Sequence, residues 1–428
     1  MHGRVRELFG GHRPNRYTPA VDSAVDVTRT PPAFPIAPLS IYWFLYFTGL
    51  GIFYPFYSLY LRDNAGLSGT QVGIVMATLP LVGMVAQPLW GQIADRSGAR
   101  STVLALLTVG SALGYTALTS LNGFTALVLG TAALAAAATA VVPVSLSVTF
   151  AALRGAGPHA FGFVRVWGTI GYLLAVALFP WALQRWTPAA ADAGASALAV
   201  MFPATAVFTL AAALVWPWLP RRSPAVMRAG RGEWRVLLRS APLRRLIGFC
   251  LVAYLFLQGP MSLFPLFVRQ RGGDLATIGH MWIVMLLLEV PLVALSGAGL
   301  RRFGARGLLG VGVLAGGVRW TVCALSHDLA ILYPIQLLHG VVVTGLLLGA
   351  PLYLELIVPD RLRSTGQGLL ATASVGLGGI LSNAACGWLI DHIGIDATYA
   401  IGGIGGLLLG ASIRFVLPEP QMDTDDYR

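Results

Sequence analysis

The sequence predicts an all-α integral membrane protein with twelve transmembrane helices in two pseudo-symmetric six-helix bundles. Two observations predict this fold: the composition of the chain and an internal repeat. Of the 428 residues, 56% are hydrophobic and only 11% are charged, and the mean hydropathy is +0.71. A water-soluble fold of this composition would expose far too much apolar surface.

Apolar runs long enough to cross a bilayer recur along the chain. A hydrocarbon core of about 30 Å requires about 20 apolar residues in a helix. Such runs lie at residues 37–61, 71–93, 101–119, 123–150, 161–185, 197–219, 243–268, 275–299, 306–325, 330–356, 365–388 and 396–417. They give six predicted helices on each side of the longest internal loop.

A basic ten-residue stretch occurs twice, each time between two apolar runs. Residues 91–100 read Gly-Gln-Ile-Ala-Asp-Arg-Ser-Gly-Ala-Arg, residues 297–306 read Gly-Ala-Gly-Leu-Arg-Arg-Phe-Gly-Ala-Arg, and five of the ten positions are identical. The copies lie nearly half a chain apart, so we interpret the chain as two versions of one membrane unit. Such duplication is typical of secondary transporters, whose substrate site lies between the halves near the middle of the bilayer.

Membrane topology explains the formal net charge of +11. All 29 basic residues are arginines. If the N-terminus is cytoplasmic, the tails and cytoplasmic loops hold about 23 of them, and the opposite side holds Arg62, Arg185, Arg269 and Arg271. This asymmetry follows the positive-inside rule. We therefore predict a multi-pass protein of the cell (inner) membrane with both termini cytoplasmic, and no nucleic-acid partner.

The same patterns predict how the chain is divided. The predicted segments are a flexible cytoplasmic tail (1–36), an N-terminal bundle (37–219), a central cytoplasmic loop (220–242), a C-terminal bundle (243–418) and a second tail (419–428). The first tail lacks the apolar core of a signal peptide. Cys250, Cys323 and Cys386 are isolated within apolar runs, so no disulfide, metal or cofactor is expected. We expect a monomer in the lipid bilayer.

The first copy of the repeat fits the pattern Gly-x-x-x-Asp-Arg-x-Gly-x-Arg between the second and third predicted helices, and residues 37–418 resemble the major facilitator superfamily. Other segments are similar to its phenylpropionate permease-like and lactose permease-like proton symporters. These segments are Tyr54-Pro55-Phe56-Tyr57-Ser58-Leu59-Tyr60-Leu61, Gly162-Phe163-Val164-Arg165-Val166-Trp167-Gly168, Glu289-Val290-Pro291, Arg319-Trp320 and His339-Gly340. The resemblance implies the major facilitator fold.

The repeated loop is a candidate cytoplasmic gate, formed by Gly91, Asp95, Arg96, Gly98 and Arg100. Asp95 is the only acid in a basic turn, so it can face the positive N-terminal end of a neighbouring helix. Arg96 and Arg100 can pair with acids or helix ends, and such contacts would form in one state and break in the other. Arg301 replaces the acid in the second copy, where the alternative interpretation, plain positive-inside anchors, fits better.

Three ionisable residues within the second bundle are candidates for proton coupling. Charges at membrane depth are costly and normally turn inward to pair or to serve a pathway. Glu289 can bind a proton when it is desolvated, with Arg319 as its expected partner and His339 as a relay. A static buried ion pair is the alternative. The lactose permease-like pattern also has an acid three residues after the histidine, where this chain has Val342.

Arg165 is the candidate ligand for an anionic substrate. The fourth predicted helix offers only hydroxyls around Pro143 and no acid that could neutralise Arg165. A guanidinium without an internal anion favours a substrate carboxylate, although a water-solvated or backbone-bonded arginine is the alternative.

Aromatic residues on the first predicted helix offer a second binding element. Tyr42, Tyr46, Phe53, Tyr57 and Tyr60 recur at helical spacings and stack on one face. Of these, Tyr46, Phe53 and Tyr57 are candidate substrate ligands with Gln258, and helix packing is the alternative. Gln87 and Asn383 add neutral polar groups within apolar runs, and we expect His280 and Trp282 to lie at the membrane interface.

These observations predict a secondary active transporter that works by alternating access and couples a small organic solute to protons in symport. An organic or aromatic carboxylate is the leading substrate. The alternatives are a proton-antiport exporter of drugs or metabolites and a transport-incompetent membrane receptor or sensor. An enzyme would need clustered acids or histidines, which the sequence does not offer.

Overall fold

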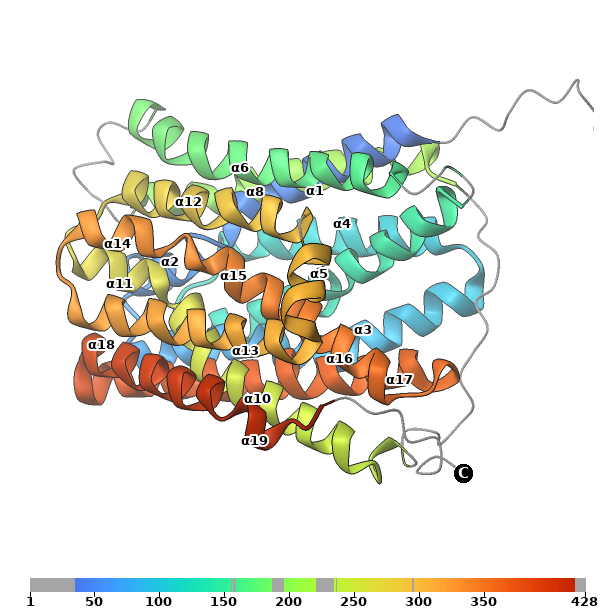
Figure 1. The fold of residues 1–428 in the computed structure, drawn as a ribbon. Coiled ribbons are helices and arrows are strands. Elements are labelled where there is room, and N and C mark those ends of the chain that lie inside the picture. Colours follow the sequence, from blue (N-terminus) through green and yellow to red (C-terminus); the bar gives the residue numbers. More distant parts are fainter. Residues whose placement is uncertain are drawn as a thin grey trace, which may run out of the picture. The chain divides into compact units, whose positions relative to one another are not determined.

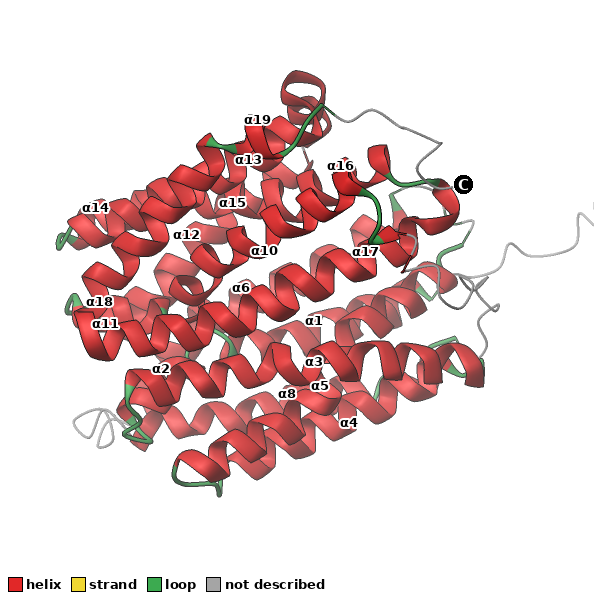
Figure 2. Cartoon of the chain, turned by 90° about the horizontal axis from the view of Figure 1, so that it is seen from below, coloured by secondary structure: helices red, strands yellow, loops and turns green. Residues whose placement is uncertain are grey.

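The computed structural model describes residues 35–154, 156, 159–186, 196–220, 235, 237–294 and 296–419. All regular structure in these residues is helical, and the helices lie side by side between two ends of the bundle (Figures 1 and 2). Most of the predicted tail at 1–36, most of the loop at 220–242 and nearly all of the tail at 419–428 lie outside the described residues. The predicted domain limits therefore stay predictions.

The described residues up to Pro220, here called the first half, form six helical spans. In order they are α1 (Ile36–Phe53) with α2 (Tyr57–Asp63), α3 (Gly69–Ser97), α4 (Arg100–Leu118), α5 (Phe124–Ala152), α6 (Ala160–Trp186), and η1 (Ser196–Val200) with α8 (Met201–Ala213) and η2 (Trp216–Trp218).

The described residues from Arg235 onward, here called the second half, form six more. They are α10 (Ala241–Ser262) with α11 (Phe264–Gln270), α12 (Leu275–Ala294), α13 (Ser296–Leu325), a span of α14 (Leu329–Ile335), α15 (Leu338–Thr344), η3 (Gly345–Gly349) and α16 (Ala350–Ile357), a span of η4 (Asp360–Leu362), α17 (Arg363–Ala371), η5 (Thr372–Gly378) and the start of α18 (Gly379–Ala411), and a last span of the rest of α18 with α19 (Ile413–Val416).

The observed spans match the twelve predicted runs. Ten segments of the described chain are long and apolar enough to cross a membrane, and the shorter apolar helix α12 adds another. The longest segment, Asp360–Ala411, is interrupted at Gly394, whose φ of 83° is not helical, so it holds two spans. The all-α membrane fold is therefore confirmed. The three cysteines are free and buried.

Two glycines of the repeated stretch share a positive φ, although their ψ angles of 0° and 172° differ. Gly98 ends α3 with a φ of 65°, and Gly304 interrupts α13 with a φ of 65°. Residues with a Cβ rarely adopt a positive φ, so both copies need glycine at this position. The identity of the two copies here thus has a local structural cause.

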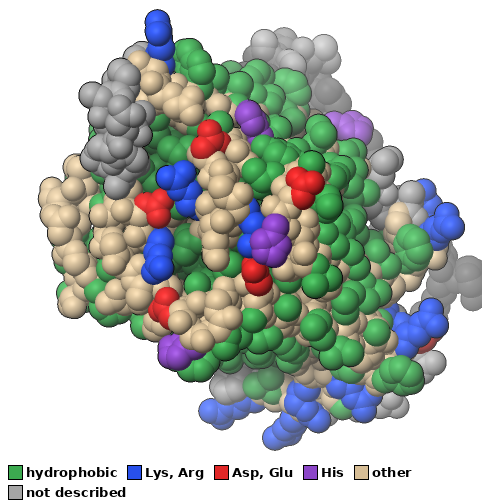
Figure 3. All heavy atoms as spheres, turned by 90° about the vertical axis from the view of Figure 1, so that its left-hand side faces the viewer, with side chains coloured by type: hydrophobic (Ala, Val, Ile, Leu, Met, Phe, Trp, Pro, Cys, Tyr) green, Lys and Arg blue, Asp and Glu red, His purple; other side chains and the backbone are tan. Residues whose placement is uncertain are grey.

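Two ends of the bundle are distinguished below. The terminal end holds Pro35, Glu419 and the turn between α3 and α4, whereas the distal end holds the turns between α2 and α3 and between α11 and α12. Figure 3 looks onto the distal end, where acidic, arginine and histidine side chains gather near the middle of the face. Between the halves, α3 packs on α18, α6 on α12 and α2 on α11.

Candidate functional site

A cavity of about 420 Å³ lies between the two halves. Its aromatic lining residues are Tyr46, Phe53, Tyr54, Tyr115 and Trp282, and its neutral polar ones are Gln87, Thr139, Gln258, Ser262 and Asn383. Among the described residues, no Arg, His, Asp or Glu lines it. The cavity can therefore offer a solute ring faces and neutral hydrogen-bonding groups, but no charge.

The aromatic stripe of α1 and α2 divides between this cavity and the interior of the first half. Tyr46 and Phe53 line the cavity. Tyr57 is fully buried, and its hydroxyl lies 2.5 Å from that of Thr131 on α5. Tyr57 therefore packs within the first half, and it is not among the described residues that line the cavity.

Arg165 of α6 lies beside the aromatic side chains of α1 and is also outside the cavity lining. Its guanidinium stacks 4.8 Å from the ring of Trp43 and 4.3 Å from the ring of Phe47. Its buried Nη1 has no hydrogen-bond partner among the described residues. Glu289 of α12 is near enough to attract it electrostatically. Glu289 forms its ion pair with His339 instead, and none of the ion pairs of the described residues joins it to Arg165.

The three residues predicted for proton coupling form a chain through α12, α15 and α13. His339 Nε2 lies 3.8 Å from Glu289 Oε2, and Arg319 Nη1 lies 3.1 Å from His339 Nδ1. A guanidinium can only donate, so Nδ1 accepts this hydrogen bond, and the proton of the neutral ring is assigned to Nε2, toward Glu289. The predicted direct pair between Glu289 and Arg319 is not among the ion pairs of the described residues, because His339 lies between them.

Neutral partners hold Arg319 in place. Its Nε donates to Gln336 Oε1 at 2.8 Å, and its guanidinium lies 4.0 Å from the ring of Trp320. A second cavity of about 190 Å³ is lined by Arg319 and His339. It shares Gln258 and Met261 with the main cavity. Arg319 and His339 thus line a cavity that borders the main one through these two side chains, whereas Glu289 is in neither lining.

Contacts within the first half brace the predicted gating loop. Asp95 Oδ1 accepts hydrogen bonds from Nε and Nη2 of Arg100 at 3.0 and 2.8 Å. Arg96 is exposed, and the space around Gly91 is open. These contacts fix the turn between α3 and α4, and the gating role of the loop stays a prediction.

An acid at the distal end joins the two halves. Asp391 of α18 accepts hydrogen bonds from the backbone N–H groups of Gly69 and Thr70, at 2.8 and 2.7 Å, and from the Thr70 hydroxyl at 2.7 Å. Gly69 and Thr70 begin α3, so the carboxylate lies at the positive end of a helix in the other half. The sequence did not single out Asp391, because an acid at a helix end is common.

Two further contacts join the halves at the same end. Arg269 Nε lies 3.5 Å from Asp63 Oδ2, across α11 and α2. The backbones of Gly73 on α3 and Gly387 on α18 are so close that a Cβ on Gly73 would lie 2.9 Å from the Gly387 Cα. Both backbone packing and charged groups therefore join the halves at this end.

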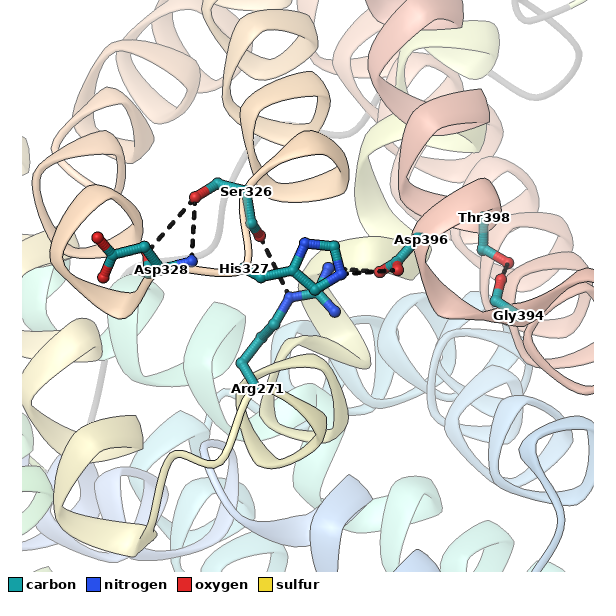
Figure 4. A network of polar contacts seen from close by, with 7 residues as sticks. All are labelled: Arg271, Ser326, His327, Asp328, Gly394, Asp396 and Thr398. Carbon is teal, nitrogen blue, oxygen red and sulfur yellow. Dashed lines mark hydrogen bonds and ion pairs between the residues drawn. The ribbon is translucent and has the colours of Figure 1, made fainter.

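A separate polar network at the distal end joins only elements of the second half (Figure 4). Arg271, which follows α11, bonds Asp396 of α18 and donates to the Ser326 carbonyl at 3.2 Å. His327 Nε2 lies 3.6 Å from the other Asp396 oxygen. Arg271, predicted only as a topology residue, thus holds three spans together.

Comparison with known proteins agrees with this architecture. Residues 36–401 match the MFS_1 like family. The chain is 30% identical over 364 residues to the maltose permease of Geobacillus stearothermophilus, covering 84% of this chain and 89% of the relative. It is 26% identical to the probable 3-phenylpropionic acid transporter of Escherichia coli strain K12, covering 70% and 77%.

Solved structures share the fold. The crystal structure of the nucleoside transporter NupG superposes with a TM-score of 0.78 at 16% identity, covering 90% of this chain and 100% of that chain. At this identity the likeness concerns the fold alone. Together with the family match, these findings show that the chain belongs to the MFS_1 like family and is a multi-pass membrane transporter of the major facilitator superfamily, not an enzyme.

Proposed function

We propose that this transporter carries a small, neutral, ring-bearing solute with several hydroxyl groups across the cell (inner) membrane, by alternating access and in symport with protons. The observation that carries the proposal is the lining of the main cavity. Aromatic faces such as those of Tyr46 and Trp282 stack on sugar or nucleoside rings, and amides such as Gln258 exchange hydrogen bonds with hydroxyls.

A neutral solute fits this cavity better than the carboxylate predicted from the sequence. Taking a carboxylate out of water without a cationic partner is far more costly than burying a hydrogen-bonded hydroxyl. The described lining offers no such cation. A relative that covers most of the chain is named a maltose permease, which supports a neutral sugar-like solute.

The chain of Glu289, His339 and Arg319 supports proton coupling. A proton added at Nδ1 of His339 would break its hydrogen bond with Arg319, whereas a proton on Glu289 leaves that bond intact. A protonated Glu289 also no longer attracts Arg165 of the other half. Its charge therefore links proton binding to the contact between α12 and α6, as coupling requires.

We place the terminal end in the cytoplasm, following the positive-inside distribution of arginines. The contacts of Asp391, Arg269 and Gly73 then close the outer side of the cavity in this conformation. Alternating access would break these contacts and close the cavity at the terminal end instead.

An organic carboxylate is the second candidate substrate. Nη1 of Arg165 is buried without a hydrogen-bond partner in the described chain, and one relative is named a probable 3-phenylpropionic acid transporter. A substrate anion that paired with Arg165 would give this atom a partner.

Uptake into proteoliposomes with an imposed pH gradient tests these alternatives, with maltose, uridine and 3-phenylpropionate as probes. We expect maltose or uridine to accumulate when the outside is acidic. Accumulation of 3-phenylpropionate alone would overturn the neutral substrate. Accumulation only with an acidic interior would show antiport, and no movement of any probe under either gradient would contradict the proposal and favour a receptor.

Glu289→Gln tests the coupling role. The amide cannot exchange a proton, so we expect uphill accumulation to be lost while exchange of solute down its own gradient continues. Glu355→Gln, at an exposed acid of α16, serves as the matched control and should behave like the parent protein. Full uphill transport by Glu289→Gln would show that the assigned coupling role is wrong.

A further inference from the structure

Two polar side-chain atoms of the cavity-lining residues have no hydrogen-bond partner in the described chain. They are Oδ1 of Asn383 on α18 and Nε1 of Trp282 on α12, and both atoms are buried. Asn383 as a whole is only 3% exposed. Buried polar groups in native proteins are nearly always paired, so an unpaired donor and acceptor at one cavity indicate a missing partner.

Both residues lie where the two halves meet. The backbone oxygen of Asn383 packs against Gly73 of α3, at the distal contact between α3 and α18. The ring of Trp282 packs against Tyr172 of α6, with ring centroids 6.2 Å apart. Both polar atoms are thus on packed helices at the contact between the halves and are held in place before a solute arrives.

The chemistry of the two atoms restricts the partner. An amide oxygen only accepts hydrogen bonds, and an indole nitrogen only donates them. Hydroxyl groups of one solute can donate to Asn383 Oδ1 and accept from Trp282 Nε1, whereas an ionised carboxylate cannot donate to Asn383 Oδ1. We propose that Asn383 and Trp282 form a hydroxyl-binding subsite that selects neutral polyhydroxyl solutes, an inference that rests on the function proposed above.

The remaining lining residues fit this role. Gln258 already donates from Nε2 to Ser262 Oγ at 3.3 Å, so its amide is partly satisfied within the protein. Tyr46, Phe53 and Tyr115 of the first half supply aromatic surface to the same cavity. A solute ring between these aromatics and the subsite would touch both halves. Its affinity would therefore depend on how far apart the halves lie.

Two substitutions test the subsite by transport of maltose and uridine, which separate a saccharide from a nucleoside as the source of the hydroxyl. Asn383→Leu removes the amide at similar size, and Trp282→Phe removes the N–H but keeps an aromatic ring. We expect each change to raise KM about tenfold for the transported probe, with the maximal rate within about twofold of the parent, because a solute hydroxyl then stays buried without a partner.

Matched controls separate this effect from general damage. Asn64→Leu removes another amide whose oxygen is buried and unpaired in the described chain, at the end of α2 and away from the cavity lining. Trp388→Phe changes an exposed tryptophan of α18. Both should keep the parental KM. Trp282→Phe decides the question alone if Asn383→Leu does not fold.

Deoxy analogues of the transported probe give the sharper outcome. With the parent protein, the analogue that lacks the bound hydroxyl should have a KM about tenfold higher than that of the full probe. With Asn383→Leu, the two KM values should be almost equal. Parental KM values in both substituted proteins would overturn the subsite and leave the proposed function intact. Transport of 3-phenylpropionate alone, with no neutral probe moved, would overturn both.

Discussion

The distal and terminal ends of this transporter use similar charged groups for different purposes. At the distal end, Asp391 and Arg269 of the second half contact α3 and α2 of the first half. At the terminal end, the ion pair of Asp95 with Arg100 stays within the first half, and that of Arg306 with Glu419 stays within the second. The contacts of Asp391 and Arg269 therefore depend on how the halves are placed, whereas these terminal contacts depend only on the fold of each half.

This difference shows how the fold can switch without unfolding. Exposed ion pairs and charges at helix ends each contribute about 1 kcal/mol or less, so the distal charged contacts form and break at small cost. The backbone contact of Gly73 with Gly387 adds close packing without a flexible side chain. A solute or proton that binds one state better by a few kcal/mol can then shift the population.

The largest effect on the distal contacts is expected from Gly73→Ala. The new Cβ would lie 2.9 Å from the Gly387 Cα, and two packed backbones cannot easily move apart locally. Overpacking should destabilise the state with a closed distal end by about 1–3 kcal/mol. The ratio of closed to open molecules would then fall by about 5- to 150-fold. We expect uptake to fall accordingly, and a membrane-impermeant maleimide to label a distal cysteine faster. Gly248→Ala, in open space on α10, is the control and should change neither.

A smaller effect is expected from Asp391→Asn. The amide removes the negative charge from the start of α3, which should cost about 1 kcal/mol and shift the distal equilibrium about fivefold toward opening. Asp274→Asn is the matched control, because Asp274 accepts a 2.7 Å hydrogen bond from the Thr277 N–H at the start of α12, within one half. Equal distal labelling in both variants would show that Asp391 does not hold the halves together.

The smallest effect is expected from Asp63→Asn. The Asp63 carboxylate lies 3.5 Å from the Arg269 guanidinium, and the two side chains are 32% and 50% exposed. Loss of such an exposed pair should cost about 0.5 kcal/mol, which corresponds to about twofold faster labelling at the distal end. The difference from the parent should vanish in 1 M salt, because exposed charges are then screened over about 3 Å. A difference that persists in high salt would contradict a purely electrostatic contact.

The twelve helices could be predicted from the sequence because membrane spans leave a strong hydropathy signal. Tyr46, Phe53 and Gln258, predicted as substrate ligands, line the cavity, and helical spacing places Tyr46 and Phe53 on one face, but their role in binding stays a prediction. The same spacing could not show that Thr131 of α5 binds Tyr57, because that depends on packing between helices.

The distal contacts and the unpaired cavity groups could not be predicted either, because they also depend on packing between helices. Asp391 meets Gly69 across 322 positions of the chain, and nothing in either local sequence marks the pair. Trp282 resembles an interfacial tryptophan by its place near a helix end, yet it lines the cavity. Asn383 did give a signal, as a lone amide in an apolar run, but not the identity of its partner.

Distances between spin labels on the two halves test the proposed switching most directly. In a variant whose three buried cysteines are replaced by alanine, one label pair at positions 120 and 392 reports on the distal end, and another at positions 92 and 364 reports on the terminal end. With the transported solute and protons present, we expect a longer distal distance and a shorter terminal distance in the same molecules. Unchanged distances, or two ends that move in the same direction, would contradict alternating access between these halves.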